Sequence, residues 1–555
     1  MLKIKNVLLL TFIFILGLSL RIWHIDKPQG LWNDEYVSWF IASAPFPQEF
    51  FNEMIKNCHM PLYYFFLKFW MSTFGNTDLI LRLSSVFLGG LSILTMFFVG
   101  KKFKDEKLGL FCALLSAVSG FLIYFSQEVR LYQLLFLICS INLFAWLNLA
   151  REQSKKNFIF FAIINIFIIL THTIGFVFVI FNILFICIYL IKKDKNLLKP
   201  SLFFIFGVFF VCLLVSPFLY KVFRGDYFSQ FWSGFSLGKI FFTFADYFSP
   251  IQVNIINTPR SLLSFIFKQN NYMYLIFGVL PLFISIVAIT KALISKNREL
   301  VYLSLTAGSY FIALLVASSI GKLVLETKYS VEIYPLLLLL LAFGLMNFKK
   351  TIIRKSLICV MIILPLFHYL VNKNSVPKLG RSEGNKVVIQ LLREAKIRPS
   401  DKVFLTYYSK DKFWRYLGDD KYKIIAIDKY NFTGYLFGGK YSYSQVLANG
   451  KDLYYEGFKN NDTKYFDERL DDIFLKHMYS GERVAVVLLK NVSFFSKDQI
   501  KQITLDKKEY KNTPLLFLVF SYIKNNTLTY FSKHLTLDLV LECDDWVLVV
   551  FRNDN

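Results

Sequence analysis

Long apolar runs separated by short polar connections dominate residues 1–372. A helix needs about 20 mostly apolar residues to cross a bilayer, and eleven runs in this part of the chain approach or reach that length. The pattern predicts a polytopic α-helical membrane protein with about eleven transmembrane helices. The predicted helices cover residues 5–22, 81–100, 108–126, 131–150, 157–171, 173–191, 201–220, 271–291, 300–320, 330–347 and 354–371.

Basic residues gather in every second connection between these runs, beginning with Lys3 and Lys5. Since Lys and Arg near helix ends remain on the cytoplasmic side, we expect the N-terminus inside and the C-terminus outside. The two long connections, 23–80 and 221–270, then lie outside. The basic connections are residues 101–107, 151–156, 192–199, 291–298 and 349–355.

The composition agrees with a membrane protein. The 555 residues are 55% hydrophobic and 18% charged, with a net charge of +24 from 63 Lys and Arg against 39 Asp and Glu. This hydrophobicity excludes a disordered chain. Because the basic clusters lie at helix ends, they favour anionic lipid headgroups rather than nucleic acid. The seven cysteines form no CxxC pair, so the sequence does not indicate a disulfide framework or a zinc knuckle.

Residues 373–555 are more polar and contain short runs typical of strands. A helical pattern at 387–395, and a possible short helix near 412–417, alternate with them. The mixture predicts a small extracytoplasmic α/β domain, so the chain divides into a transmembrane domain, 1–372, and a soluble domain, 373–555. The predicted strands are residues 402–408, 423–427, 483–489, 515–520 and 546–551.

Two adjacent carboxylates, Asp34 and Glu35, follow the first predicted span and have Trp32 and Tyr36 beside them. Two interpretations are open. An interfacial loop would also place aromatic residues at the headgroup level. Alternatively, a carboxylate in a partly desolvated site can take a proton from an acceptor hydroxyl during group transfer.

Further motifs lie at the outer ends of the predicted spans. Each is weak alone, but all are predicted on the same side of the membrane. Charged residues at such positions are functional candidates by default. The motifs are His59-Met60-Pro61-Leu62-Tyr63-Tyr64, Phe74-Gly75 with Arg82-Leu83-Ser84, Ser126-Gln127-Glu128-Val129-Arg130-Leu131-Tyr132, and Glu326-Thr327-Lys328-Tyr329.

In order and spacing these motifs resemble the C-type (GT-C) membrane glycosyltransferases. The similarity is strongest to the branch with protein O-mannosyltransferases and the lipid A aminoarabinose transferase, glycosyltransferase families 39 and 83. It covers residues 1–220 well and continues more loosely to about 345. Two positions depart from the family pattern. Met60 replaces the first proline of a Pro-Pro pair, and Lys328 replaces an arginine, so phosphate would meet a point charge instead of a fork.

The resemblance implies a polyprenyl-phosphate sugar as donor and inversion at the anomeric carbon by direct displacement. It implies Asp34 as the general base. Glu35 would orient Asp34 or raise the pKa of Asp34 by like-charge proximity, and Glu128 would position the acceptor or sugar. Arg130 and Lys328 would bind the lipid phosphate. The remaining substrate-binding candidates are His59, Tyr63, Arg82, Tyr132 and Tyr329.

Simpler roles remain open for several of these residues. Glu35 could be a solvated neighbour, Glu128 could pair with Arg130, and His59 could be structural. The cations could be interfacial anchors. The aromatic connection 221–270 could close over the lipid or lie passively on the surface.

No HExxH or DxD motif and no P-loop occurs, so we expect no obligatory metal or cofactor beyond the lipid-linked donor. The predicted function is glycosyl transfer at the extracytoplasmic face of the inner or plasma membrane. The acceptor, whether lipid, polysaccharide or protein, is not specified. A flippase or transporter for lipid-linked sugars and an oligosaccharide ligase are alternatives, as is a non-enzymatic receptor that uses residues 373–555.

Overall fold

The computed structural model divides the chain into two compact units, residues 1–26 with 33–379 and residues 27–32 with 380–555. The structure describes residues 4–26, 30–57, 59–200, short pieces within 202–248, 272–319, 327–348, 350–372, 385–405, 415, 423–426, 464–489, 515–543 and 546–554.

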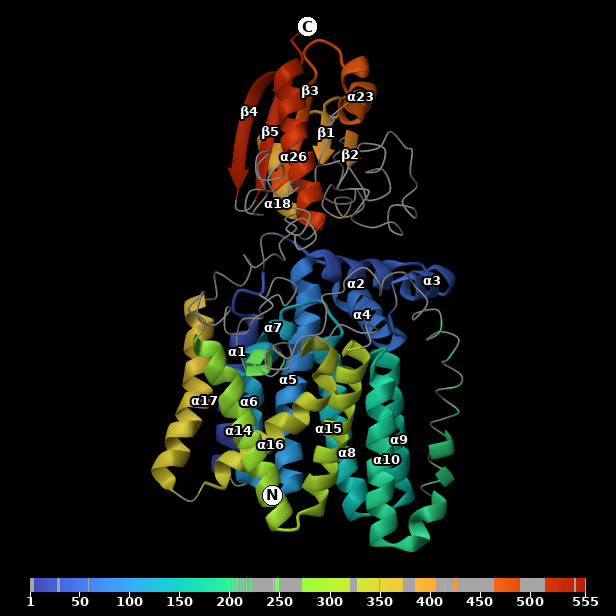
Figure 1. Ribbon diagram of the computed structural model, residues 1–555, viewed down its shortest axis with the longest axis vertical. Coiled ribbons are helices and arrows are strands. Elements are labelled where there is room, and N and C mark those ends of the chain that lie inside the picture. Colours follow the sequence, from blue (N-terminus) through green and yellow to red (C-terminus); the bar gives the residue numbers. More distant parts are fainter. Residues whose placement is uncertain are drawn as a thin grey trace. The chain divides into compact units, whose positions relative to one another are not determined.

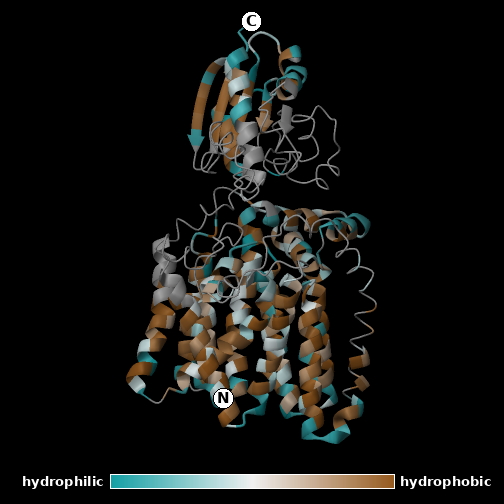
Figure 2. Ribbon diagram, viewed as in Figure 1, coloured by the Kyte–Doolittle hydropathy of each residue, from teal (hydrophilic) through white to brown (hydrophobic). Residues whose placement is uncertain are grey.

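The first unit is a bundle of long helices with hydrophobic residues along their lengths (Figures 1 and 2). Among its described residues, six helices are long and apolar enough to cross a membrane, or seven if one bent pair counts as a span. The unit is therefore that of a membrane protein, but the predicted eleven spans are not confirmed. The six are α1 (Ile4–Ile22), α5 (Asp78–Phe103), α8 (Tyr132–Arg151), α10 (Gly175–Lys193), α15 (Arg298–Ser319), and the 3-10 helix η4 (Thr327–Ile333) with α16 (Tyr334–Met346).

Three further helices coincide with other predicted spans. The 17-residue α9 (Lys155–Thr171) matches the shortest predicted run. Helices α14 (Tyr272–Ile294) and α17 (Thr351–Asn372) match two more. Most of the predicted span at 201–220 lies outside the described residues.

The span predicted at 108–126 is broken into α6 (Glu106–Val118) and α7 (Gly120–Ser126), which meet at an angle of 59°. Ser119 begins the second helix, because its hydroxyl accepts the N–H of Leu122. The guanidinium of Arg21 donates to the carbonyls of Ser116 and Ala117, both at 2.9 Å. These carbonyls would otherwise lack partners at a helix end, so a buried arginine from α1 stabilises the break.

The basic connections meet at one end of the bundle. Arg151 pairs with Glu299 at the start of α15, at 2.9 Å, and also donates to the carbonyl of Phe103 at 2.9 Å. Lys193 donates to the carbonyl of Ala150 at 3.0 Å. The connections after α5, α8, α10 and α14 therefore share one end, as the alternation of charges predicts. Which side of a membrane this end faces remains a prediction.

Helices α2 (Asn33–Ser43), α3 (Gln48–Lys56) and α4 (Pro61–Phe74) occupy the long first connection. Figure 1 shows them at the end of the bundle opposite the N-terminus. Pro61 begins α4 at a position that suits its fixed φ. Lys68 donates to the carbonyls of Ala42 and Ala44, at 3.0 and 2.7 Å, and so holds α4 against the end of α2.

The second unit contains a five-stranded mixed sheet with strand order β2-β1-β3-β5-β4. The pairs β1–β2 and β1–β3 are parallel, whereas β3–β5 and β4–β5 are antiparallel. The strands are β1 (Lys402–Leu405), β2 (Lys423–Ala426), β3 (Arg483–Leu489), β4 (Thr536–Cys543) and β5 (Trp546–Arg552).

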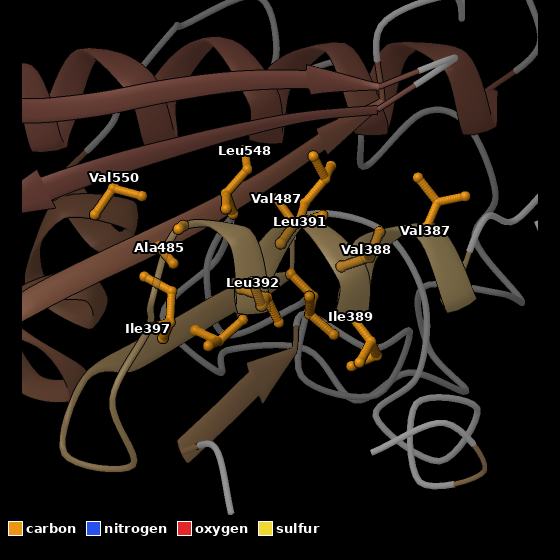
Figure 3. Close-up of a cluster of buried hydrophobic side chains, with 13 residues drawn as sticks. Val387, Val388, Ile389, Leu391, Leu392, Ile397, Ala485, Val487, Leu548 and Val550 are labelled. Carbon is orange, nitrogen blue, oxygen red and sulfur yellow. The ribbon is translucent and has the colours of Figure 1, made fainter. Parts of the chain in front are cut away.

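Helices cover both faces of this sheet. On one face, α18 (Asn385–Glu394) packs Val388, Leu391 and Leu392 against inward-facing strand residues such as Val487 (Figure 3). On the other face, the alternate strand residue Phe404 lies 5.1 Å from the ring of Phe474. This second layer comes from α23 (Lys464–Ile473) and α26 (Leu515–His534).

The strand predicted at 515–520 is wrong, because these residues begin helix α26. The run was too short to span a bilayer, but its continuation has helical spacing, with Asn526, Thr527, Tyr530 and Phe531 buried. Strand β4 was not predicted, because polar residues interrupt its apolar positions. The short helix expected near 412–417 lies outside the described residues except for position 415.

Asp401, just before β1, is a buried carboxylate that makes the second unit sensitive to acid. Burial opposes its charge, but hydrogen bonds from Arg398 and Arg483 hold its pKa below the usual value. This stabilisation is present above the unfolded pKa, near 3.9, and is lost as the pH falls through the folded pKa. We expect the unit to loosen below about pH 4, and Asp401→Asn to destabilise it by about 2 kcal/mol at pH 7.

Hydrogen exchange of the full-length protein, read on peptides from residues 385–405 and 483–489, would check this. Unchanged exchange in Asp401→Asn at pH 7 would contradict it.

Candidate active site

Asp34 and Arg130 form an ion pair at the end of the bundle where α2 lies. Arg130 Nη2 is 3.2 Å from Asp34 Oδ2, and Nη1 donates to the Asp34 carbonyl at 3.2 Å. The Asp34 side chain is 28% exposed, whereas that of Arg130 is 7% exposed. Asp34 also lies in the first turn of α2, where the helix dipole favours negative charge. A fixed cation therefore holds a carboxylate that solvent can still reach.

Glu35, the next residue, faces the interior. Its two carboxylate oxygens accept hydrogen bonds from Arg82 Nε and Nη2, at 3.0 and 2.8 Å. It also accepts the backbone N–H of Val129 at 3.1 Å. Both charged side chains are 0% exposed. The pair thus joins α2, α5 and the turn before α8, a geometry that favours a positioning role for Glu35 and Arg82 over direct contact with a substrate.

The turn between α7 and α8 is fixed on both sides. Gln127 Nε2 donates to the carbonyls of Arg21 and Trp23, at 3.0 and 2.7 Å. Ser85 on α5 donates to the carbonyl of Glu128 at 2.6 Å. The Glu128 side chain is buried beside the site. Arg130, which sequence reasoning allowed to pair with Glu128, is directed to Asp34 instead.

His59 lies in the turn before α4, where its N–H donates to the carbonyl of Met54 at 3.0 Å. Its ring is 5.3 Å from that of Tyr64. Burial, and then the charge of Arg130, lower the pKa of His59 to about 3. The imidazole is therefore neutral at physiological pH. Tyr63, its neighbour in the motif, is fully buried, and burial raises its pKa.

The neutral imidazole of His59 predicts how the rate of any reaction at this site depends on pH. A free histidine titrates near 6.5, but His59 should stay uncharged between about pH 5.5 and 8. We expect His59→Gln to leave the shape of the pH–rate profile unchanged over this range. A limb near pH 6.5 in the wild type that disappears in His59→Gln would contradict the assignment.

A row of aromatic rings connects the two cations expected to bind phosphate. The Arg130 guanidinium lies 5.6 Å from the ring centre of Tyr132. The His172 ring contacts Tyr132 at 6.3 Å and stacks on Tyr329 at 6.2 Å. Lys328 Nζ lies 5.1 Å from the Tyr329 ring. Tyr132, Tyr329 and both cations therefore belong to one continuous site.

Three buried residues of this site were not predicted: His172, Tyr310 and Glu332. His172 Nδ1 is 2.7 Å from Glu332 Oε1, and the Tyr310 hydroxyl donates to Glu332 Oε2 at 2.9 Å. The sequence did contain a signal, because Glu332 is the one acidic residue in the apolar run 330–347. Acidic residues inside such runs are costly and therefore functional candidates.

No group of three or more His, Cys, Asp or Glu side chains that could hold a metal ion occurs in the part of the chain that the structure describes. The expectation that no metal is required remains a prediction. Of the connection 221–270, the structure describes residues 243 and 245–248. The prediction that this connection closes over the lipid therefore falls largely outside the described residues.

Comparison with known proteins finds a family model that matches part of the chain. Residues 58–220 match the family model of dolichyl-phosphate-mannose-protein mannosyltransferases. That segment contains the motif residues from His59 to Tyr132 but neither Asp34 nor Lys328. Comparison with curated protein sequences finds no match.

Two solved structures share the fold. ArnT from Cupriavidus metallidurans, in the apo state, is similar at 13% identity with a TM-score of 0.51, over 98% of this chain and 97% of that one. The apo oligosaccharyltransferase from Archaeoglobus fulgidus is similar at 13% identity with a TM-score of 0.50, over 88% and 70%. Both likenesses are at low identity and concern the fold, and the family match covers residues 58–220 of the 555.

Proposed function

We propose that the protein transfers a sugar from a polyprenyl-phosphate donor to an acceptor hydroxyl at the extracytoplasmic face of the inner or plasma membrane. The observation that carries the proposal is the Asp34–Arg130 pair, in which a reachable carboxylate oxygen lies 3.2 Å from a buried guanidinium. A transferase of this class needs a base and a phosphate-binding cation within one site, and these two residues provide that combination.

The reaction that fits these residues is a single displacement. Asp34 accepts the proton of the acceptor hydroxyl as its oxygen forms a bond to the anomeric carbon. The bond from that carbon to the phosphate oxygen breaks, and the polyprenyl phosphate leaves with the electron pair. Attack opposite the leaving group inverts the anomeric centre. Arg130 and Lys328 stabilise the charge on the departing phosphate through charge-assisted hydrogen bonds.

The other residues orient these groups. Glu35 and Arg82 fix the first turn of α2, which carries Asp34. Glu128 and neutral His59 lie beside the site and can hydrogen-bond a sugar. Tyr132 and Tyr329 present aromatic faces between the two cations.

The proposal includes an orientation for the whole chain. In this orientation the basic end faces the cytoplasm, and we propose that Asp34 and residues 373–555 are both extracytoplasmic. The donor is lipid-linked, and its sugar and the acceptor are left to experiment.

Purified protein in lipid, offered a panel of polyprenyl-phosphate sugars, would test the function. Release of free polyprenyl phosphate with at least one donor is the expected result, and that donor would identify the sugar. Absence of release with every donor, accompanied by movement of labelled lipid between leaflets, would replace the proposal with a flippase.

A further inference from the structure

The short helix η4 presents two residues and buries the others. Thr327, Ser330, Val331, Glu332 and Ile333 are buried, whereas Lys328 and Tyr329 are half-exposed. The backbone departs from helical geometry at Ser330, with φ −128° and ψ 23°. Seven residues with a kink have little rigidity of their own, so the direction of Lys328 depends on what holds η4.

Glu332 provides the first set of contacts. Its side chain is 0% exposed, and its carboxylate lies 2.7 Å from His172 Nδ1. The hydroxyl of Tyr310 on α15 donates to Glu332 Oε2 at 2.9 Å and also lies 3.0 Å from the carbonyl of Tyr329. These hydrogen bonds fix both the side chain of Glu332 and the backbone immediately after Lys328.

His172 connects Glu332 to the two half-exposed residues, Lys328 and Tyr329. It follows α9 directly, and its ring is nearly parallel to that of Tyr329, with an interplanar angle of 14°. The Lys328 ammonium lies against the same Tyr329 ring, at 5.1 Å. A chain of contacts therefore runs from Glu332 through His172 and Tyr329 to Lys328.

Tyr247 provides a second set of contacts. Its hydroxyl donates to the carbonyl of Ser330 at 2.5 Å, and its ring stacks on Tyr334 at 4.6 Å. The Tyr334 hydroxyl is 2.7 Å from that of Ser119, at the break between α6 and α7. The kink of η4 is thus connected through Tyr247 and Tyr334 to the break between α6 and α7. Lys328 and Tyr329 are held by these contacts and by those of Glu332.

We propose that Glu332 and His172 are positioning residues that hold Lys328 where it binds the phosphate of a polyprenyl-phosphate donor. This inference rests on the proposed function. The inference predicts whether loss of Glu332 strengthens or weakens phosphate binding. Loss of a negative charge near an anion site should by itself strengthen phosphate binding, whereas loss of a support for the binding cation should weaken it.

Binding of polyprenyl phosphate to the full-length protein in lipid nanodiscs, measured by displacement of a fluorescent analogue, separates these cases. We expect Glu332→Ala and Lys328→Ala each to weaken binding about tenfold. The double variant should bind no more weakly than Lys328→Ala, because both changes remove the same interaction. Glu332→Gln can still accept the Tyr310 hydroxyl at its amide oxygen and can donate its NH2 to an unprotonated His172 Nδ1, so it should remain within about twofold of the wild type.

Two further variants separate positioning from general loss of packing. Tyr310→Phe removes one hydroxyl without any change of charge and should weaken binding about threefold. Asn165→Ala is the matched control, because Asn165 is a buried residue of α9 that accepts a hydrogen bond from Asn182 at 2.9 Å. It should bind as the wild type does.

The outcomes distinguish this inference from the proposed function. If the wild type binds polyprenyl phosphate but Glu332→Ala and Tyr310→Phe bind it equally well or better, the positioning role is wrong. Losses that multiply in the double variant also overturn it. If the wild type neither binds polyprenyl phosphate nor releases it from any donor, the proposed function fails as well.

Discussion

Asp34→Asn should lower the turnover of sugar transfer by about 10²–10⁴-fold, the range typical for loss of a general base. Asparagine keeps the size of the side chain and can still accept a hydrogen bond from Arg130, but it cannot take a proton at neutral pH. The folded structure and the donor affinity should therefore change little. Steady-state release of polyprenyl phosphate, with donor binding measured in parallel, gives both quantities.

A matched control is available on the neighbouring helix. Glu49 lies in the first turn of α3, as Asp34 does in α2, but it is exposed and outside the site. Glu49→Gln should keep wild-type turnover. If Asp34→Asn retains full turnover and Glu128→Gln loses it, the base is Glu128, in spite of its 1% exposure.

The sequence predicted which residues gather at one end of the bundle but not how they pair. The motif positions between Asp34 and Tyr132 follow from the ends of the spans, and α1, α5, α8 and α10 cover the predicted runs within a few residues. The pairing of Arg130 with Asp34 depends on how α2 packs against the turn before α8. These residues are 96 positions apart, so no local pattern encodes the contact.

The helices of the first connection were missed for a related reason. The stability of α2 depends on tertiary contacts, such as those of Lys68 with its last carbonyls, more than on its own short sequence. Tertiary context also made a helix of residues 515–520, where the local pattern favoured a strand. Hydrophobic patterns in the sequence identify long apolar spans well. Polar contacts between distant segments cannot be predicted in this way, because they depend on the tertiary fold.

Loss of either partner of the Glu35–Arg82 pair should destabilise the protein by about 3–5 kcal/mol, because it leaves an uncompensated charge in the interior. Both side chains are 0% exposed and joined by two hydrogen bonds. Glu35→Leu and Arg82→Leu should each lower the midpoint of thermal unfolding in detergent. The double variant should recover a large part of the loss, since two apolar side chains leave no buried charge unpaired.

The half-exposed pair Lys101–Glu106, at 3.0 Å, is the control, and Glu106→Gln should leave the midpoint nearly unchanged. The comparison also separates two roles for Glu35 and Arg82. Unfolding at the wild-type temperature with transfer abolished would assign them a direct role in the reaction, as the family resemblance suggested for Arg82. Early unfolding, rescued in the double variant, would assign them to the framework that presents Asp34. The buried geometry favours the second result. Arg82 Nε and Nη2 already donate to the buried carboxylate of Glu35, so few of the guanidinium N–H groups remain for a phosphate.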